Sequence, residues 1–253
     1  LYLTVFFGYR TYQLLPSTLT FGLLVTIAVA SGVLAVLQNA LALVFVGTVG
    51  GFAAPILASS GSGDYVALFS YYVVLNLLVL GVAWFKDWRL LSITGFIATY
   101  GVGTAWGVLK YSPENFATVE PFLIAFFCIY VALNMVSALR RPESLRGLSS
   151  SLTFGLPLVT IALQASLAGD RDWIVAVAAL AMGALYYGLA RVLIARKNEQ
   201  TGILVDSYTA LAVGLATLSV PYALDSAAMT AGTWILEAGG LYWVGIRGQR
   251  WLP

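Results

Sequence analysis

Residues 65–85 read YVALFSYYVVLNLLVLGVAWF, and this stretch decides the fold. It contains no charged residue, whereas Asp64 precedes it and Lys86 follows it. A bilayer is spanned by a helix of roughly 20 apolar residues, because lipid offers no partners to backbone N–H and C=O groups and a helix satisfies them internally. A transmembrane β-barrel would need short alternating segments instead. We therefore predict a membrane-spanning helix at residues 65–85.

The composition extends this prediction to the whole chain. Of its 253 residues, 60% are hydrophobic and 9% are charged, whereas a soluble domain carries about a quarter charged residues. We predict an all-α fold, a polytopic transmembrane helix bundle that forms a single transmembrane region over residues 1–253. About nine full spans are expected, and the other eight lie near residues 17–37, 39–58, 88–109, 121–139, 149–168, 173–195, 203–220 and 229–246.

The chain opens on an apolar stretch, Leu1 to Tyr9, which Arg10 and Pro16 interrupt. This stretch is too short to span a bilayer. A secretory signal would need a basic region ahead of the apolar one and a small-residue cleavage site behind it, and neither is present. We interpret the stretch as a truncated first helix, and the chain as an internal fragment of a longer membrane protein.

Basic residues are divided unequally between the connections. When successive connections are assigned to opposite faces of the membrane, one face collects most of the lysines and arginines. Because basic residues of short loops stay in the cytoplasm, we predict that this face, and with it the C-terminal end, is cytoplasmic. It holds Lys86, Arg89, Arg140, Arg141, Arg146, Arg191, Arg196, Lys197, Arg247 and Arg250, and the other face holds Arg10, Lys110 and Arg171.

The residue types exclude several classes of chemistry. Histidine is absent, and the single cysteine, Cys128, lies inside an apolar run. Histidine-based triads, thiolate zinc sites and disulfide frameworks are therefore excluded, and we expect neither a metal nor a cofactor. The net charge of +2 is spread over many loops and forms no basic stripe, so nucleic acid is not an expected partner. The expected partner is the lipid bilayer.

Glu237 is the first candidate for a functional residue, because it lies near the middle of the predicted last span. An ionised carboxylate there costs at least a few kcal/mol unless it is paired, hydrated or protonated. Glu237 is therefore either functional or a protonated group bonded to a neighbouring helix. Arg191 and Asp206 lie at similar depths on consecutive predicted helices, and an ion pair between them would fit. From spacing alone, we predict that Asp206 and Glu237 share a cytoplasm-facing polar cavity.

Other polar side chains lie inside the predicted spans. Such residues usually bond across helices, and we favour this interpretation over their lining a cavity. They are Tyr71, Asn76, Asn134, Gln164 and Tyr208.

Small residues recur at a spacing that allows close backbone approach. Gly47 and Gly51, and likewise Gly103 and Gly107, are four positions apart. Gly50, Gly51 and Pro55 also mark a glycine-rich, proline-broken helix end. We read it as a helix terminus followed by a tight turn, and the alternative is that it exposes backbone groups to a ligand.

Two parts of the chain resemble each other. Residues 17–23 read STLTFGL and residues 150–156 read SSLTFGL, and Ser70-Tyr71 aligns with Ser207-Tyr208 further along. The copies are separated by five predicted spans, so they would be inverted in the membrane, as in many transporters. Membrane helices draw on few residue types, and chance matching is the stronger explanation.

Several short motifs occur in a fixed order along the chain. They are Gly50 to Phe52 with Pro55, Gly61 to Gly63, Ala67 to Tyr72, Ala83 to Lys86, Trp88-Arg89, Glu120 to Leu123, Pro221 to Asp225 and Trp234 to Ala238. In these motifs the chain resembles one family, the large multi-pass bacterial membrane proteins of the domain of unknown function 2339. The resemblance runs through most of the chain and implies a bacterial inner-membrane protein, a fragment of a longer one, without implying an activity. A small departure is Leu236-Glu237-Ala238-Gly239, where the family pattern reads Leu-Glu-Gly-Ala.

Three functions are compatible with these features. Transport or channelling of a small solute or ion is favoured, on the basis of Glu237, Asp206 and the inverted similarity. The alternatives are an envelope enzyme that acts on a lipid-linked or acyl substrate and a membrane scaffold. The enzyme would use the carboxylates predicted on the outer face, among them Glu114, Glu120, Asp170 and Asp172.

Overall fold

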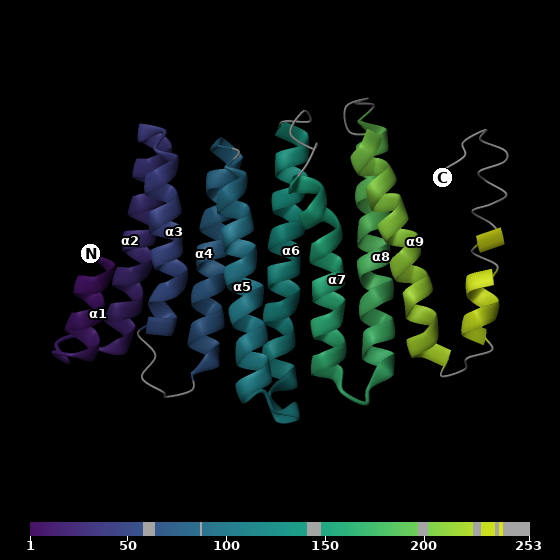
Figure 1. Ribbon diagram of the computed structural model, residues 1–253, viewed down its shortest axis with the longest axis horizontal. Coiled ribbons are helices and arrows are strands. Elements are labelled where there is room, and N and C mark those ends of the chain that lie inside the picture. The colour runs from purple at the N-terminus through teal and green to yellow at the C-terminus, as the bar shows by residue number, and fades with distance from the viewer. Residues whose placement is uncertain are drawn as a thin grey trace. The chain divides into compact units, whose positions relative to one another are not determined.

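The computed structural model describes residues 1–57, 64–86, 88–140, 148–196, 202–224, 229–235 and 238–239. Every regular element in these residues is a helix (Figure 1), which confirms the all-α prediction. Two compact units divide the chain, unit 1 (Leu1–Thr160) and unit 2 (Ile161–Pro253). The elements are α1 (Tyr2–Arg10), α2 (Ser17–Gln38), α3 (Leu41–Leu57), α4 (Tyr65–Phe85), α5 (Arg89–Lys110), the 3₁₀ turn η1 (Pro113–Asn115), α6 (Phe116–Arg140), α7 (Leu148–Ala168), α8 (Asp172–Ala195) and α9 (Gly202–Leu224).

Helices occur at the predicted positions, and the stretch at residues 65–85 is α4. Residues 229–235 are helical, whereas Glu237 and most of the predicted last span lie outside the described residues. By length and composition, four helices in the described part can cross a membrane, and α2, α3 and α7 contain shorter apolar segments. A count of nine spans therefore stays a prediction. The four are Tyr65–Phe85, Pro113–Arg140, Asp172–Ala195 and Gly202–Leu224.

Unit 1 is built from stacked helical hairpins. The helices α2 and α3 pack against each other, as do α4 and α5. The first hairpin stacks on the second with corresponding helices in contact, because α2 packs on α4 and α3 packs on α5. The next helix, α6, continues this order by packing on α4. The polar site of unit 1 lies where these helices meet.

The turns that reverse the chain have a local cause in the sequence. Asn39, between α2 and α3, has φ +52°, a left-handed conformation that asparagine tolerates better than most residues. Gly169, between α7 and α8, has φ +58°, and glycine adopts this conformation without steric cost. At the start of α4, the carboxylate of Asp64 accepts a hydrogen bond from the N–H of Ala67 at 3.0 Å and caps the helix.

Unit 2 contains the closely packed pair α8 and α9. Gly183 of α8 allows this approach, because a Cβ atom at that position would lie 3.1 Å from the carbonyl oxygen of Ala212 on α9. Beside this contact, the buried rings of Tyr186 and Tyr208 pack with their centroids 5.2 Å apart. The hairpin therefore rests on close backbone approach supported by an aromatic pair.

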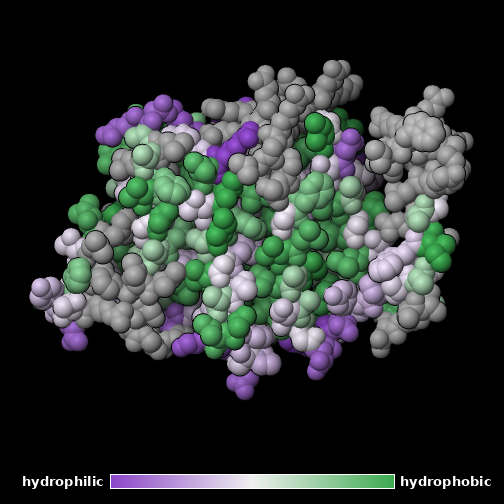
Figure 2. Space-filling model, viewed as in Figure 1, coloured by the Kyte–Doolittle hydropathy of each residue, from purple (hydrophilic) through white to green (hydrophobic). Residues whose placement is uncertain are grey.

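Apolar side chains cover the outer flanks of the helices in both units. Leu77 of α4, Ile97 of α5 and Val177 of α8 are each about half exposed or more. In Figure 2, hydrophobic residues follow the lengths of the helices, and strongly hydrophilic residues gather near the helix ends. This distribution is the one that a bilayer requires of its helices.

Candidate functional site

A buried cluster of polar side chains joins the helices of unit 1. We call it the polar clamp, and it consists of Tyr71, Tyr72, Asn76, Thr99 and Tyr130. Each of these side chains is at most 2% exposed. The chain positions them on three helices: the first three on α4, Thr99 on α5 and Tyr130 on α6. The residues that form the clamp carry no charge at neutral pH.

Asn76 is the centre of the polar clamp. Its side-chain amide donates to the hydroxyl of Thr99 at 2.8 Å and to the backbone carbonyl of Tyr72, one turn earlier on α4, at 2.9 Å. Its carbonyl oxygen accepts a hydrogen bond of 2.6 Å from the hydroxyl of Tyr130. Both N–H groups and the oxygen of the amide are therefore used, as burial of an amide in an apolar environment requires.

Two tyrosines of the clamp point toward α3, and Pro55 explains the bond that one of them, Tyr71, makes there. A proline has no N–H, so the carbonyl four residues earlier, that of Gly51, loses its helical donor. The hydroxyl of Tyr71 donates to this oxygen at 3.1 Å. The hydroxyl of Tyr72 donates to the next carbonyl, that of Phe52, at 2.8 Å. The clamp thus satisfies the backbone of α3 beside the proline and connects α3 to α4.

Gly95 makes room for the central bond of the clamp. A Cβ atom at this position of α5 would lie 2.9 Å from the hydroxyl oxygen of Tyr130 and 3.5 Å from the amide oxygen of Asn76. The first distance is too short for a real contact, so a larger residue would displace the tyrosine. The ring of Phe96, the next residue of α5, packs edge-on against Tyr130 with the centroids 5.5 Å apart. The position of the hydroxyl is therefore fixed sterically.

A second buried bond within unit 1 joins α5 to α7. The hydroxyls of Tyr100 and Thr160 are 3.0 Å apart, and either can donate. The ring of Tyr100 packs on Phe96 at 4.7 Å and lies 6.1 Å from that of Tyr130. Continuous ring packing therefore links this bond to the polar clamp.

Aromatic side chains hold the two ends of the α4–α6 region. At one end, Phe69 is surrounded by the rings of Trp106, Phe122 and Phe126 at centroid distances of 5.2 to 6.3 Å. At the opposite end of α4, the guanidinium carbon of Arg140 lies 4.0 Å from the centroid of the Trp84 ring. The clamp lies between these two clusters along α4.

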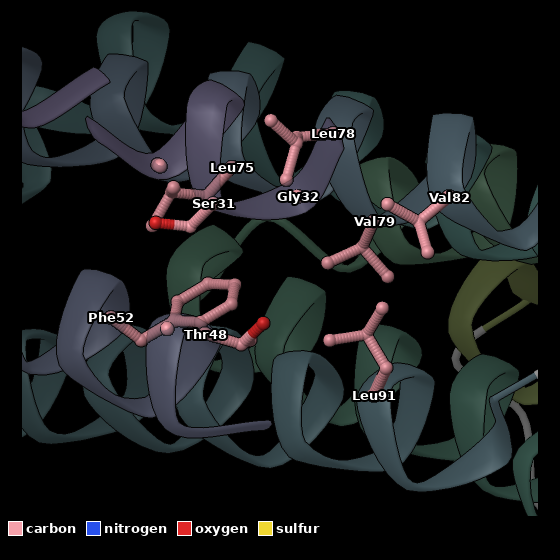
Figure 3. Close-up of a pocket in the computed structure, with 11 residues that line it drawn as sticks. Ser31, Gly32, Thr48, Phe52, Leu75, Leu78, Val79, Val82 and Leu91 are labelled. Atoms are coloured by element: carbon pink, nitrogen blue, oxygen red, sulfur yellow. The ribbon is translucent and has the colours of Figure 1, made fainter. Parts of the chain in front are cut away.

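A small cavity lies beside the clamp, between α2, α3, α4 and the start of α5. Its volume is about 20 Å³, which is room for about one water molecule. Ser31 and Thr48 bring hydroxyl groups to a wall that is otherwise formed mainly by apolar side chains (Figure 3). The ring of Phe52 also lines the cavity, and it packs edge-on against the ring of Tyr72 with the centroids 5.3 Å apart. This volume is too small for an organic solute.

Of the residues that the sequence singled out first, Arg191 and Asp206 belong to unit 2. Asp206 is exposed in the second turn of α9, and Arg191 is exposed on α8, where it donates to the hydroxyl of Tyr187 at 3.4 Å. Glu237 lies outside the described residues. The ion pair of Arg191 with Asp206, and the cavity shared by Asp206 and Glu237, stay predictions.

The helix break predicted at Gly50, Gly51 and Pro55 lies within α3, which continues to Leu57. The proline leaves a carbonyl without its helical donor, as expected, and Tyr71 fills the place that a ligand would take. A binding role for this segment stays a prediction.

Some polar residues were interpreted correctly, and others were missed. Tyr71 and Asn76 bond across helices, as favoured from the sequence. Thr99 and Tyr130 were not singled out, because threonine and tyrosine are common in membrane helices and neither residue type alone indicates a bonding partner.

The spacing rule for glycines holds at Gly47, where a Cβ atom would lie 3.4 Å from that of Ser31.

The same rule does not hold at the second glycine pair. Apart from the adjoining residues and backbone of α5 itself, no atom of the described residues lies within 4 Å of a Cβ atom placed at Gly103 or Gly107. Close packing through these two glycines is therefore not observed.

The acidic residues assigned to the outer face do not form a metal site in the described part of the chain, where no three His, Cys, Asp or Glu side chains come together. Asp64 serves as a helix cap, and Glu114 lies in the 3₁₀ turn before α6. A catalytic role for the outer carboxylates stays a prediction.

Apolar outer flanks, membrane-length helices and an uncharged buried polar cluster together define a helical integral membrane protein. Over residues 1–253 the chain matches the sequence profile of the family described as "Predicted membrane protein (DUF2339)", and it belongs to this family. The resemblance seen in the sequence is thereby confirmed. No curated protein and no solved structure matches the chain.

Proposed function

We propose that this region is a rigid scaffold within the membrane, a stack of helical hairpins on which other membrane proteins assemble. The observation that carries the proposal is the polar clamp, which joins α3, α4, α5 and α6 through buried hydrogen bonds. Asn76 of α4 bonds to α5 and to α6, so a movement of any of these three helices relative to the others breaks a bond at the centre of the unit.

The energetics favour a fixed arrangement. Each hydrogen bond between membrane helices contributes about 0.6 kcal/mol on average and about 1.7 kcal/mol at most. The cost of separating the helices is larger, because polar groups left without partners in an apolar environment cost roughly 1–3 kcal/mol each. A shift of α6 would release the hydroxyl of Tyr130 and the amide oxygen of Asn76 together. The clamp therefore resists the helix movements that alternating access would need.

The packing order also supports a scaffold. Corresponding helices of successive hairpins contact each other, since α2 packs on α4 and α3 packs on α5. Repeating units that contact mainly their neighbours build extended surfaces, and soluble solenoid proteins use such surfaces to bind partners. The outward side chains of these helices are apolar, so the partners would be membrane proteins whose helices pack against them in the bilayer.

The experiment compares the full-length protein with a variant that lacks the clamp, Asn76→Leu combined with Tyr130→Phe. Each is tagged, extracted in mild detergent and purified, and the co-purified proteins are quantified by mass spectrometry. We expect a membrane-protein partner at a fixed stoichiometry with the wild type, reduced at least threefold in the variant at equal membrane content.

The control is Asn134→Leu, which removes a half-buried amide from α6 outside the clamp. It should retain the partner. If the wild type yields no partner at fixed stoichiometry, or if all three proteins retain it equally, the scaffold proposal is wrong.

Transport of a small solute or ion remains a second candidate. It is supported by Tyr208, whose hydroxyl is buried without a hydrogen-bond partner in the described part of the chain, and by Asp206 two residues earlier. Together with Glu237, these groups could form a polar path through the region of α9. In proteoliposomes that contain the full-length protein, Glu237→Gln and Asp206→Asn should then each reduce solute or proton flux about tenfold. Absence of flux with the wild type would remove this candidate.

A further inference from the structure

One end of unit 1 combines basic and aromatic side chains at the level where α4 ends. Trp84 and Phe85 form the last turn of α4, and their side chains are 50% and 67% exposed. Lys86 follows directly, and the guanidinium of Arg140, at the end of α6, lies over the Trp84 ring at 4.0 Å. Apolar surface and positive charge thus lie side by side at a helix end.

Further residues extend this surface. Arg89 begins α5, and Leu90 beside it is 51% exposed. Asp87, which lies outside the described residues, is the acidic residue of this connection, so bases outnumber acids there. The opposite end of the same helices carries Asp64 before α4 and Glu114 before α6. That opposite end also carries Lys110 at the end of α5, so in the described residues two acids face one base there, whereas bases predominate at the first end. The first end is therefore the one whose charge favours anions.

We propose that this end of unit 1 binds the headgroup of an anionic phospholipid of the bilayer. The headgroup phosphate would contact Arg140 and Lys86, and the upper part of the acyl chains would lie against Trp84 and Phe85. The occupant is a lipid of the surrounding membrane, because the exposed aromatic side chains match an acyl chain and have no counterpart on a free phosphate ion.

The contact between Arg140 and Trp84 prepares the site. A cation over a ring face is held by electrostatic attraction to the ring, which uses none of its N–H donors. Arginine presents these donors in a planar fork that suits phosphate oxygens. Tryptophan is also the side chain that favours the boundary between headgroups and hydrocarbon. The ring therefore holds the guanidinium at the depth where lipid phosphates lie.

The test measures lipid binding to the full-length protein by native mass spectrometry. The protein is delipidated and titrated with phosphatidylglycerol, with phosphatidylcholine, or with inorganic phosphate. We expect the wild type to retain phosphatidylglycerol in preference to phosphatidylcholine and to be insensitive to inorganic phosphate. Since one basic residue at a membrane surface contributes about 1 kcal/mol, Arg140→Gln should weaken phosphatidylglycerol binding about fivefold, and Lys86→Gln similarly.

The matched control is Lys110→Gln, which removes an exposed basic residue at the other end of α5. It should leave the preference for phosphatidylglycerol unchanged. Trp84→Leu keeps the apolar surface but removes the ring face, and it should weaken binding when Arg140 is present and have no further effect in Arg140→Gln. Equal losses in Lys110→Gln and Arg140→Gln, or no preference for phosphatidylglycerol in the wild type, would overturn the proposal.

Discussion

Asn76 concentrates the polar interactions of unit 1 in one side chain. Its amide bonds to Thr99 and Tyr130 on two neighbouring helices and to the backbone of its own helix. Asparagine suits this position because a single planar group carries both donors and an acceptor, whereas leucine of similar volume carries neither. The loss of this side chain therefore affects partners on two other helices at once.

We predict that Asn76→Leu lowers the free energy of unfolding by about 2 kcal/mol, because it leaves the hydroxyls of Thr99 and Tyr130 without the amide in a buried site. Reversible unfolding of the full-length protein in mixed detergent micelles measures this value. Asn134→Leu serves as the comparison, since its amide is half-buried outside the clamp, and it should change stability by less than about 0.5 kcal/mol. Equal effects of the two substitutions would contradict the central role of Asn76.

Single residues were only partly predictable from the sequence. An asparagine inside an apolar run has to find partners, so the bonding of Asn76 could be expected. Its partners could not, because their identity depends on the rotation of α5 and α6 about their axes. The space that Gly95 leaves for Tyr130 is visible only when α5 and α6 are placed side by side.

At the scale of the element, two predicted span boundaries fell at a proline, and the helices extend past both of them. The span predicted at residues 121–139 begins at Phe116, and the span predicted to end at residue 220 continues to Leu224. Pro121 and Pro221 lie inside these helices. Membrane helices tolerate proline because neighbouring groups can satisfy the backbone that it frees.

Helix α3 supplies a direct test of the idea that neighbouring groups satisfy the backbone that a proline frees. We predict that Tyr71→Phe costs about 1 kcal/mol of stability in the wild type, because the carbonyl of Gly51 then has neither a helical N–H nor a hydroxyl donor. In Pro55→Ala, residue 55 regains its N–H, so the same substitution should cost close to nothing. A double-mutant cycle on unfolding free energies measures this coupling.

Tyr65→Phe provides the control for the cycle. Its hydroxyl donates to the side chain of Asn115 at 3.1 Å, away from the proline. The cost of Tyr65→Phe should therefore be the same with Pro55 and with alanine at that position. A cycle in which Tyr71 and Pro55 act additively would show that the hydroxyl does not replace the missing helical donor.

For the whole molecule, the sequence indicated the class of fold but not the packing order. Composition and apolar runs predict helices in a membrane, and the helices lie where these runs occur. The similarity between residues 17–23 and 150–156, for which chance was the favoured explanation, does not indicate the packing of unit 1, where successive hairpins stack with corresponding helices in contact. This contact depends on side chains distributed over whole helices, and a short similar segment does not encode it.

The division of basic residues between the two faces can be tested on the whole chain by cysteine labelling. Cys128 is exposed on α6, so it is first replaced by alanine. Single cysteines are then placed in four connections, as Lys86→Cys, Glu114→Cys, Asp170→Cys and Arg196→Cys. Because short basic loops stay in the cytoplasm, a membrane-impermeant maleimide should label the cysteines at 114 and 170 in intact cells. Those at 86 and 196 should react only after lysis.

The two ways in which this labelling could fail have different meanings. Reaction of only the cysteines at 86 and 196 in intact cells would reverse the predicted orientation and leave the alternation intact. Reaction of the cysteines at 86 and 114 from the same side would instead mean that α5 does not cross the membrane. The tally of about nine spans would then be wrong, because every later connection would change sides, and the ten basic residues would no longer lie on one face.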